Sequence, residues 1–243
     1  MAGRADIVSA ITGPMRQRAW IRAIEPQQTN LKMKKYLTEF IGTFFLVLTV
    51  GMCVMNPHAV DVAPLAIGSA LMIMVYAGGH ISGGHYNPAV TFAVWLRGAC
   101  PGADVPGYLA SQVLGGVLAA FLALFLKGNP AVDSADLSPV PALLAELVGT
   151  FALAYVVLNV ATAKTTSGNS YFGLAIGFTV ATMAFALGAV SGGAFNPAVA
   201  VGITVMHLAK TSNLWIYLAG NFAGAGLAAA VFRYANPESK PAL

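Results

Sequence analysis

The sequence predicts an all-α membrane protein, in which six transmembrane helices and two re-entrant half-helices form two inverted three-span repeats. Three observations carry this prediction: an apolar composition, six apolar stretches of spanning length, and a duplicated short motif. The 243 residues are 57% hydrophobic and only 9% charged. Because a soluble domain carries about 25% charged residues, we expect this chain to be surrounded by a lipid bilayer.

The six apolar stretches each approach the ~20 residues that a helix needs to cross a ~30 Å hydrocarbon core. They cover residues 36–54, 62–79, 106–126, 141–163, 170–189 and 213–234. Cytoplasmic loops of membrane proteins carry most of the positive charge. With the amino terminus inside, all of the 13 lysines and arginines except Lys127 and Lys210 fall on inner segments. We therefore expect both termini in the cytoplasm, and we interpret the net charge of +4 as topology rather than nucleic-acid binding.

The chain divides into two repeats with a short tail at each end. We interpret residues 1–33 as a basic cytoplasmic tail without a cleavable signal, because the apolar stretch after Lys35 is too long and contains Glu39. An alternative is that synthesis naturally begins at Met33. The first repeat, with three spans and a half-helix, covers 34–140, the second covers 141–235, and 236–243 form a carboxy-terminal tail.

The repeat is visible as aligned sequence. Residues 65–90 read "LAIGSALMIMVYAGGHISGGHYNPAV" and align without gaps on 174–199, which read "LAIGFTVATMAFALGAVSGGAFNPAV". "TEFIGTFFL" and "YLASQVLGGVLAA" likewise return as "AELVGTFAL" and "YLAGNFAGAGLAA". Three spans per copy is an odd number, so the second copy must be inverted in the membrane. Inverted repeats place functional elements near the midplane, between the halves.

The duplicated motif begins two helices that are too short to span. "NPAVTFAVWLR" and "NPAVAVGITVM" would each be roughly 16 Å long as helices, about half a bilayer. Asn is a favoured N-cap and Pro a favoured first helical residue, so Asn87 and Asn196 should begin the half-helices and meet near the membrane centre. One copy alone would indicate no more than a capped helix. Irregular backbone at this depth must line a cavity or be buried in protein. The glycines that permit such a path are Gly83, Gly84, Gly192 and Gly193.

Two Asn-Pro-Ala boxes in inverted halves, with a glutamate in the first span of each half, resemble the major intrinsic proteins, the aquaporin and aquaglyceroporin family. The resemblance covers residues 34–234. It implies the aquaporin fold, one pore per protomer, a homotetramer in the plasma or inner membrane, and passive permeation without a cofactor. The implied solutes are water and small neutral molecules such as glycerol, urea, ammonia and hydrogen peroxide.

The resemblance also implies roles for residues of the two loops. The asparagines of the pore motifs would donate amide N–H groups to the solute, and backbone carbonyls would form an acceptor path. Glu39 and Glu146, which are costly inside a membrane, would brace the loops by accepting N–H groups. We interpret His80 and His85 as further braces, with a gating or pH role as the alternative. The pore motifs are Asn87, Pro88, Ala89, Asn196, Pro197 and Ala198; the carbonyl path is Gly83, Gly84, His85, Tyr86, Gly192, Gly193, Ala194 and Phe195.

The outer selectivity filter departs from that of the water-selective members of the family. Those proteins have an arginine after the second box, and a histidine and an aromatic side chain narrow the outer mouth with it. Here the arginine position is Val199, and ungapped alignment puts the other filter positions at Ile67, Ala184 and Gly193. None of the four side chains is charged, aromatic or able to hydrogen-bond, so we expect a wide, apolar outer mouth.

A secondary transporter is the alternative from another class, because inverted repeats with broken helices also build transporters. A coupled transporter should carry ionisable residues for its driving ion, whereas Glu39 and Glu146 already have a bracing role. An intramembrane enzyme is less consistent with the sequence, which shows no nucleophile beside a base and no metal-ligand spacing. We interpret Cys53 and Cys100 as packing residues and expect no metal.

Overall fold

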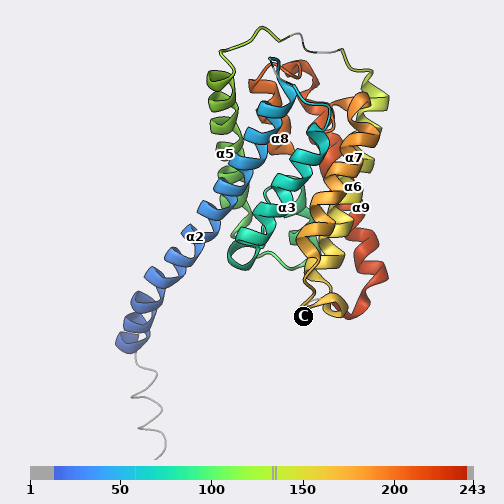
Figure 1. Cartoon of the computed structure of the whole chain (residues 1–243). Coiled ribbons are helices and arrows are strands. Elements are labelled where there is room, and N and C mark those ends of the chain that lie inside the picture. Colours follow the sequence, from blue (N-terminus) through green and yellow to red (C-terminus); the bar gives the residue numbers. More distant parts are fainter. Residues whose placement is uncertain (1–13, 58, 133, 135, 240–243) are drawn as a thin grey trace, which may run out of the picture.

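The computed structural model describes residues 14–57, 59–132, 134 and 136–239, and for 14–28 it describes the backbone alone (Figure 1). Within these ranges the regular structure is helical throughout. The long helices are α2 (Pro14–Val54), α3 (Ala63–Ser82), α5 (Val105–Leu126), α6 (Pro139–Thr162), α7 (Phe172–Ser191) and α9 (Leu214–Ala235). Two shorter helices are α4 (Pro88–Arg97) and α8 (Pro197–Val205). The ends of the two predicted tails, 1–13 and 240–243, lie outside the described residues.

Six helices are long and apolar enough to cross a membrane. These candidate spans are Thr29–Val54, Ala63–Ser82, Val105–Leu126, Pro139–Thr162, Phe172–Ser191 and Thr211–Ala235. They match the six predicted stretches to within a few residues, except that the first span begins earlier. Helix α2 is continuous from Pro14, and its amino-terminal part projects away from the bundle (Figure 1). The chain is therefore an integral membrane protein, and from Pro14 onwards the described part of the basic tail continues into the first span as one helix.

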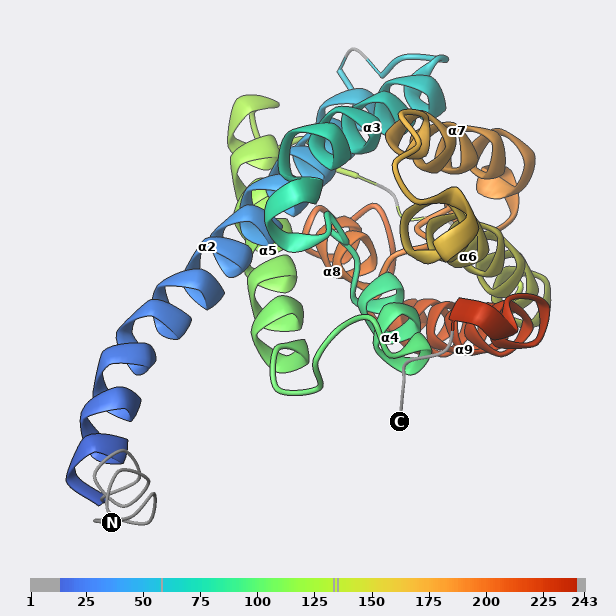
Figure 2. The same cartoon turned by 90° about the horizontal axis from the view of Figure 1, so that it is seen from below.

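Each of the two short helices packs against a long helix of the other half of the chain. Helix α4 packs against α9, and α8 packs against α5, as the view from below shows (Figure 2). The long helices pair in the same symmetrical way, α2 with α5 and α6 with α9. The six spans and the two half-helices are those of the predicted fold class, which is confirmed.

Helices α3 and α7 cross at a pair of glycines. A Cβ atom built on Gly68 would lie 2.4 Å from the carbonyl oxygen of Gly177, and one built on Gly177 would lie 2.4 Å from the carbonyl oxygen of Gly68. Small residues allow two membrane helices to approach until their backbones touch. This contact therefore sets the distance between the two halves at their shared edge.

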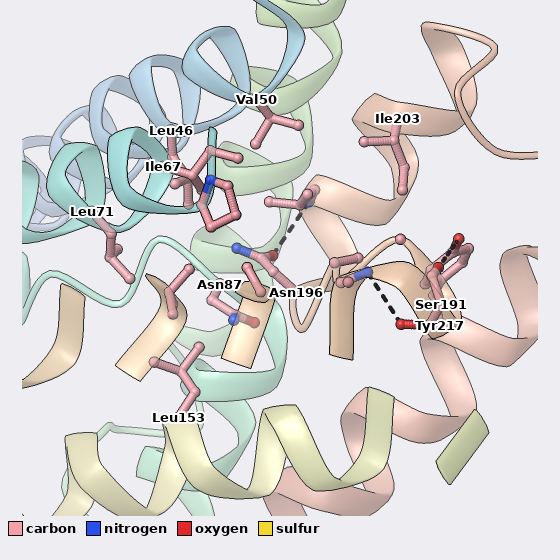
Figure 3. Close-up of a pocket in the computed structure, with 18 of the residues that line it drawn as sticks. Leu46, Val50, Ile67, Leu71, Asn87, Leu153, Ser191, Asn196, Ile203 and Tyr217 are labelled. Atoms are coloured by element: carbon pink, nitrogen blue, oxygen red, sulfur yellow. Dashed lines mark hydrogen bonds between the residues drawn. The ribbon is translucent and has the colours of Figure 1, made fainter. Parts of the chain in front are cut away.

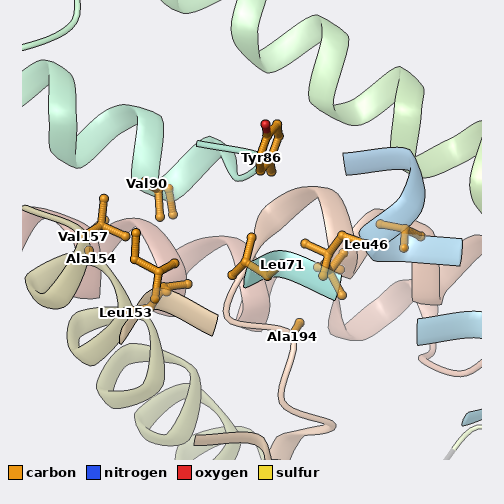
Figure 4. Close-up of a cluster of buried hydrophobic side chains, with 14 of the residues drawn as sticks. Leu46, Leu71, Tyr86, Val90, Leu153, Ala154, Val157 and Ala194 are labelled. Atoms are coloured by element: carbon orange, nitrogen blue, oxygen red, sulfur yellow. The ribbon is translucent and has the colours of Figure 1, made fainter. Parts of the chain in front are cut away.

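The buried hydrophobic side chains surround the two loops rather than filling a solid centre. Leu46, Leu71, Val90 and Leu153 come from four different helices and converge on one region (Figure 4). All four also line a cavity. By contrast, large side chains on the outside of the bundle, such as Phe125 of α5, are exposed. This distribution suits a protein whose outer surface contacts lipid or other subunits and whose interior is hollow.

The glycine crossing yields a stability prediction. Gly68→Val should lower the melting temperature of the purified protein in detergent, because the added side chain would overlap the α7 backbone. Overpacking of this kind costs about 1–3 kcal/mol. Gly188→Ala is the control, because a Cβ at Gly188 would meet no atom within 4 Å. Equal melting temperatures for the two variants would contradict the close-contact interpretation.

Candidate functional site

Both short helices begin at an asparagine that caps its own helix. Asn87 has an extended backbone (φ −158°), and its Oδ1 accepts the N–H groups of Ala89 at 2.8 Å and Val90 at 3.3 Å. Asn196 repeats this geometry, with φ −160° and a 2.9 Å bond from the Ala198 N–H. Each oxygen is thereby directed at its own helix, which leaves each amide nitrogen directed away from it.

The two amide nitrogens join the loops to each other. Asn87 Nδ2 donates to the carbonyl oxygen of Phe195 at 2.9 Å, and Asn196 Nδ2 donates to that of Tyr86 at 2.9 Å. Since an amide has two N–H groups, one on each asparagine remains for a solute. The carbonyls of Tyr86 and Phe195, which the sequence analysis put in the acceptor path, are engaged between the loops. The other six predicted carbonyls make no such bond across the loops.

Glu39 organises the first loop from inside α2. Its carboxylate is fully buried and accepts four hydrogen bonds, at distances from 2.6 to 2.9 Å. The donors are Ser82 Oγ, the backbone N–H groups of His85 and Tyr86, and Gln112 Nε2. Because these N–H groups turn towards the carboxylate, the loop backbone is held away from the lipid and its donors are satisfied.

Glu146 does the same for the second loop with one partner fewer. Its carboxylate accepts from Ser191 Oγ at 2.7 Å and from the N–H groups of Ala194 and Phe195 at 3.0 and 2.7 Å. Asn221 takes the place of Gln112 in this repeat, but its side chain instead accepts from Thr150 at 2.9 Å. The Nδ2 atom of Asn221 has no partner among the described residues.

Two aromatic side chains anchor the loops in glycine slots, a role that the sequence analysis missed. Tyr86 and Phe195 are 1% exposed and have positive φ angles of 49° and 47°. A Cβ built on Gly42 would lie 2.1 Å from the Tyr86 ring, and one built on Gly149 would lie 2.2 Å from the Phe195 ring. Both glycines belong to the aligned "TEFIGTFFL" and "AELVGTFAL" segments, so the repeat contained a signal for this anchor.

A cavity of about 500 Å³ extends from the asparagine pair towards the carboxy-terminal end of α2; we call it the upper cavity, as oriented in Figure 1. Figure 3 shows Asn87 and Asn196 close together in it, with aliphatic side chains such as Leu46, Val50 and Ile203 around them. The described lining contains no Asp, Glu, Lys or Arg. The four predicted filter positions all line it: Ile67, Ala184, Gly193 and Val199.

A second cavity of about 370 Å³, which we call the lower cavity, lies on the other side of the loops. Its wall is more polar and includes Lys35, Tyr108 and Cys100. Lys35 forms an ion pair with the buried Asp104 at 3.2 Å. Burial raises the pKa of the Cys100 thiol to about 11, so this thiol stays protonated and poorly reactive at neutral pH.

The two candidate bracing histidines lie in different surroundings. His80 is exposed in the last turn of α3, and its side chain makes no hydrogen bond to a described residue. No described contact therefore supports the predicted bracing role of His80. His85 is buried in the first loop, and its Nδ1 lies 3.1 Å from Thr91 Oγ1. Of the two histidines, His85 is therefore the one whose side chain has a hydrogen-bond partner among the described residues. Among the described residues, no three His, Cys, Asp or Glu side chains gather as a metal site.

Two cavities that meet beside paired half-helix starts, inside six membrane spans, define a channel-type membrane protein. Comparison with known proteins agrees. The family model described as "Major intrinsic protein" matches residues 25–232. The chain is 35% identical to Aquaporin AqpM of Methanothermobacter thermautotrophicus, covering 84% of this chain and 98% of that protein. It is also 35% identical to Glycerol uptake facilitator protein-like 6 of Lactiplantibacillus plantarum, over 85% of this chain and 100% of that protein.

The fold is similar to that of the aquaglyceroporin from Plasmodium falciparum, seen in its X-ray structure. The TM-score is 0.71 at 20% sequence identity, covering 86% of this chain and 98% of that one. The chain belongs to the major intrinsic protein family. It is accordingly a channel and not an enzyme.

The buried carboxylates yield a second prediction. Glu146→Gln should destabilise the protein and reduce water flux, because an amide NH₂ group would replace an oxygen that accepts loop N–H groups. An unmatched buried donor costs about 1–3 kcal/mol. Thermal unfolding in detergent measures the effect. Asp136→Asn is the control, since Asp136 pairs with Lys210 on an exposed surface, where such pairs contribute about 0–1 kcal/mol. Indistinguishable unfolding of the two variants would refute the bracing role.

Proposed function

We propose that this chain is a passive channel for water and small neutral solutes, with a wide apolar filter at its outer mouth. The observation that carries the proposal is the upper cavity, which reaches the paired asparagines and whose described lining contains no Asp, Glu, Lys or Arg. Its hydrogen-bonding groups are the asparagine amides, the loop backbone and the side chains of His85, Ser191 and Tyr217. A small polar solute finds partners there, whereas an ion finds no compensating charge.

The midplane barrier to cations follows from the two helix starts. Each helix N-terminus carries roughly +0.5 elementary charge, and α4 and α8 begin at asparagines whose side chains bond to the opposite loop. Two positive helix ends at one place repel hydronium and metal cations. A water molecule that accepts from both asparagines has also turned its own hydrogens away, which interrupts proton transfer along the water file.

The outer filter is the part in which this channel differs from water-selective relatives. The side chains at the four filter positions contribute only hydrogen, methyl, methylene and methine groups; the positions are Ile67, Ala184, Gly193 and Val199. Such a filter neither binds a solute nor repels a cation, so selection against larger neutral solutes is weak there. Glycerol, urea, ammonia and hydrogen peroxide join water as candidate solutes, and the similarity to a glycerol uptake facilitator-like protein supports this range.

A coupled transporter, the alternative, needs an ionisable group for the driving ion. Glu39 and Glu146 are both buried and engaged with loop donors, which favours a channel. Stopped-flow light scattering on proteoliposomes distinguishes the two: a channel gives non-saturating flux of water, glycerol, urea and ammonia that ignores sodium and pH gradients. Saturation of solute flux, or its coupling to either gradient, would support the transporter.

For the location, we propose the plasma or inner membrane with both termini in the cytoplasm, so that the lower cavity opens inwards. The excess of lysine and arginine on the proposed inner segments supports this orientation. A homotetramer is the proposed assembly. The exposed apolar stripe of α5 is consistent with a surface against lipid or a neighbouring subunit; its members are Leu114, Leu118, Phe121 and Phe125.

Substitutions that add a negative charge at the two helix starts test the proposed midplane barrier to cations. Asn87→Asp and Asn196→Asp should increase proton conductance in proteoliposomes while water flux persists, because a carboxylate offsets the positive helix end. Asn87→Ser is the matched control: serine is also a good N-cap and also loses the bond to Phe195, but it adds no charge. Equal proton conductance in the aspartate and serine variants would show that charge at the helix starts is not the barrier.

The filter is tested by restoring the missing arginine. Val199→Arg should lower glycerol and urea flux at least about tenfold more than water flux, the scale of discrimination for small changes in pocket size. The guanidinium narrows the mouth and supplies five N–H donors to water, and the small Ala184 and Gly193 leave it space. Val199→Leu adds bulk without charge, so it shows how much of the loss of glycerol and urea flux comes from narrowing of the mouth alone. A folded Val199→Arg channel with the wild-type glycerol-to-water ratio would contradict the wide-filter proposal.

A further inference from the structure

The upper and lower cavities meet at two side chains. His85 and Val157 are the described residues that line both cavities, and they are 8% and 7% exposed. Along α6, Leu153 lines the upper cavity, Val157 lines both, and Ala161 lines the lower one. Residues four apart lie on one face of a helix, so a single face of α6 runs from one cavity to the other. We call the His85–Val157 pair the neck.

The other half of the inverted repeat has no equivalent neck. The repeat alignment pairs His85 with Ala194 and Val157 with Val50. Ala194 and Val50 both line the upper cavity, which continues past them to residues such as Leu208 without a division. The two halves share their backbone plan, so the difference lies in the side chain: an imidazole ring fills the space that a methyl group leaves open.

Hydrogen bonds determine which nitrogen of the His85 ring can meet a solute. The Thr91 hydroxyl donates its one hydrogen to the Asn87 carbonyl at 3.0 Å and accepts from Gln112 Nε2 at 2.9 Å. Its remaining lone pair lies 3.1 Å from His85 Nδ1, so Nδ1 carries the hydrogen and donates. The neutral ring then has an unprotonated Nε2. This atom makes no hydrogen bond to a described residue, and a Cβ built on Gly83, in the wall of the lower cavity, would lie 3.0 Å from it.

We propose that the neck, and not the filter at the outer mouth, is where this channel discriminates among neutral solutes. Val157 limits the width, and His85 Nε2 accepts a hydrogen bond from the hydroxyl, amine or water hydrogen that passes. The filter side chains provide neither restriction nor a hydrogen-bonding partner. This inference rests on the proposed channel function and specifies which residues set its selectivity.

The experiment compares two valines that the inverted repeat makes equivalent. Val157→Ala removes two carbon atoms and should raise the ratio of glycerol to water permeability at least about tenfold, because a difference of one methylene already changes discrimination by about that factor in a site that selects by fit. Val50→Ala is the matched control, because it makes the same change where the passage is already open, and it should leave the ratio at the wild-type value. Both are measured by stopped-flow light scattering on proteoliposomes of equal protein content.

Two reciprocal variants test the histidine. His85→Ala should raise the glycerol-to-water ratio in the same direction as Val157→Ala, and Ala194→His should lower it by building a second neck. If His85→Ala fails to fold, Val157→Ala and Ala194→His still decide the matter.

Equal ratios for Val157→Ala, Val50→Ala and wild type, in a wild-type channel that conducts, would overturn the neck while leaving the channel function intact. Absence of water flux in the wild type would overturn both proposals.

Discussion

The structure depends on satisfying backbone N–H groups that are enclosed by the membrane spans. Two helices begin inside the bundle of spans, where each unpaired donor costs several kcal/mol. Glu39 and Glu146 meet this need by bringing a carboxylate to each loop from the neighbouring long helix. The asparagine caps satisfy the next donors along the chain. Once the donors are engaged in this way, the remaining loop carbonyls and amide N–H groups are available to a solute.

The loops are also coupled to each other, so neither half of the protein forms its part of the site alone. The bonds from Asn87 to Phe195 and from Asn196 to Tyr86 cross between the repeats in both directions. The aromatic side chains of the same two residues are locked into glycine slots of α2 and α6. A movement of one loop would therefore disturb the other loop and the helix behind it, which favours a rigid central site.

The two repeats share a backbone plan but differ in chemistry. The loop glycines have nearly equal angles in the two copies, with φ of 94° and 89° at Gly83 and Gly192. The supporting side chains differ, because Gln112 bonds to Glu39 whereas its counterpart Asn221 bonds to Thr150. His85 is likewise matched by Ala194. Alongside this asymmetry, the upper cavity has a largely aliphatic wall and the lower cavity a more polar one.

The sequence by itself determined the spans, the inverted repeat and the starts of the half-helices, because these depend on local patterns: apolar length, an odd number of spans, and Asn-Pro at a helix start. It also pointed to Glu39 and Glu146, because a carboxylate inside a membrane span is energetically costly and usually marks a functional or structural role. Only the tertiary structure decided which atoms meet across the repeats. The engagement of the Tyr86 carbonyl, the exposure of His80 and the place of Val157 in the walls of both cavities all depend on distances between segments far apart in the chain. Those distances are set by how closely the helices pack, and the spacing of residues along the sequence does not specify that packing.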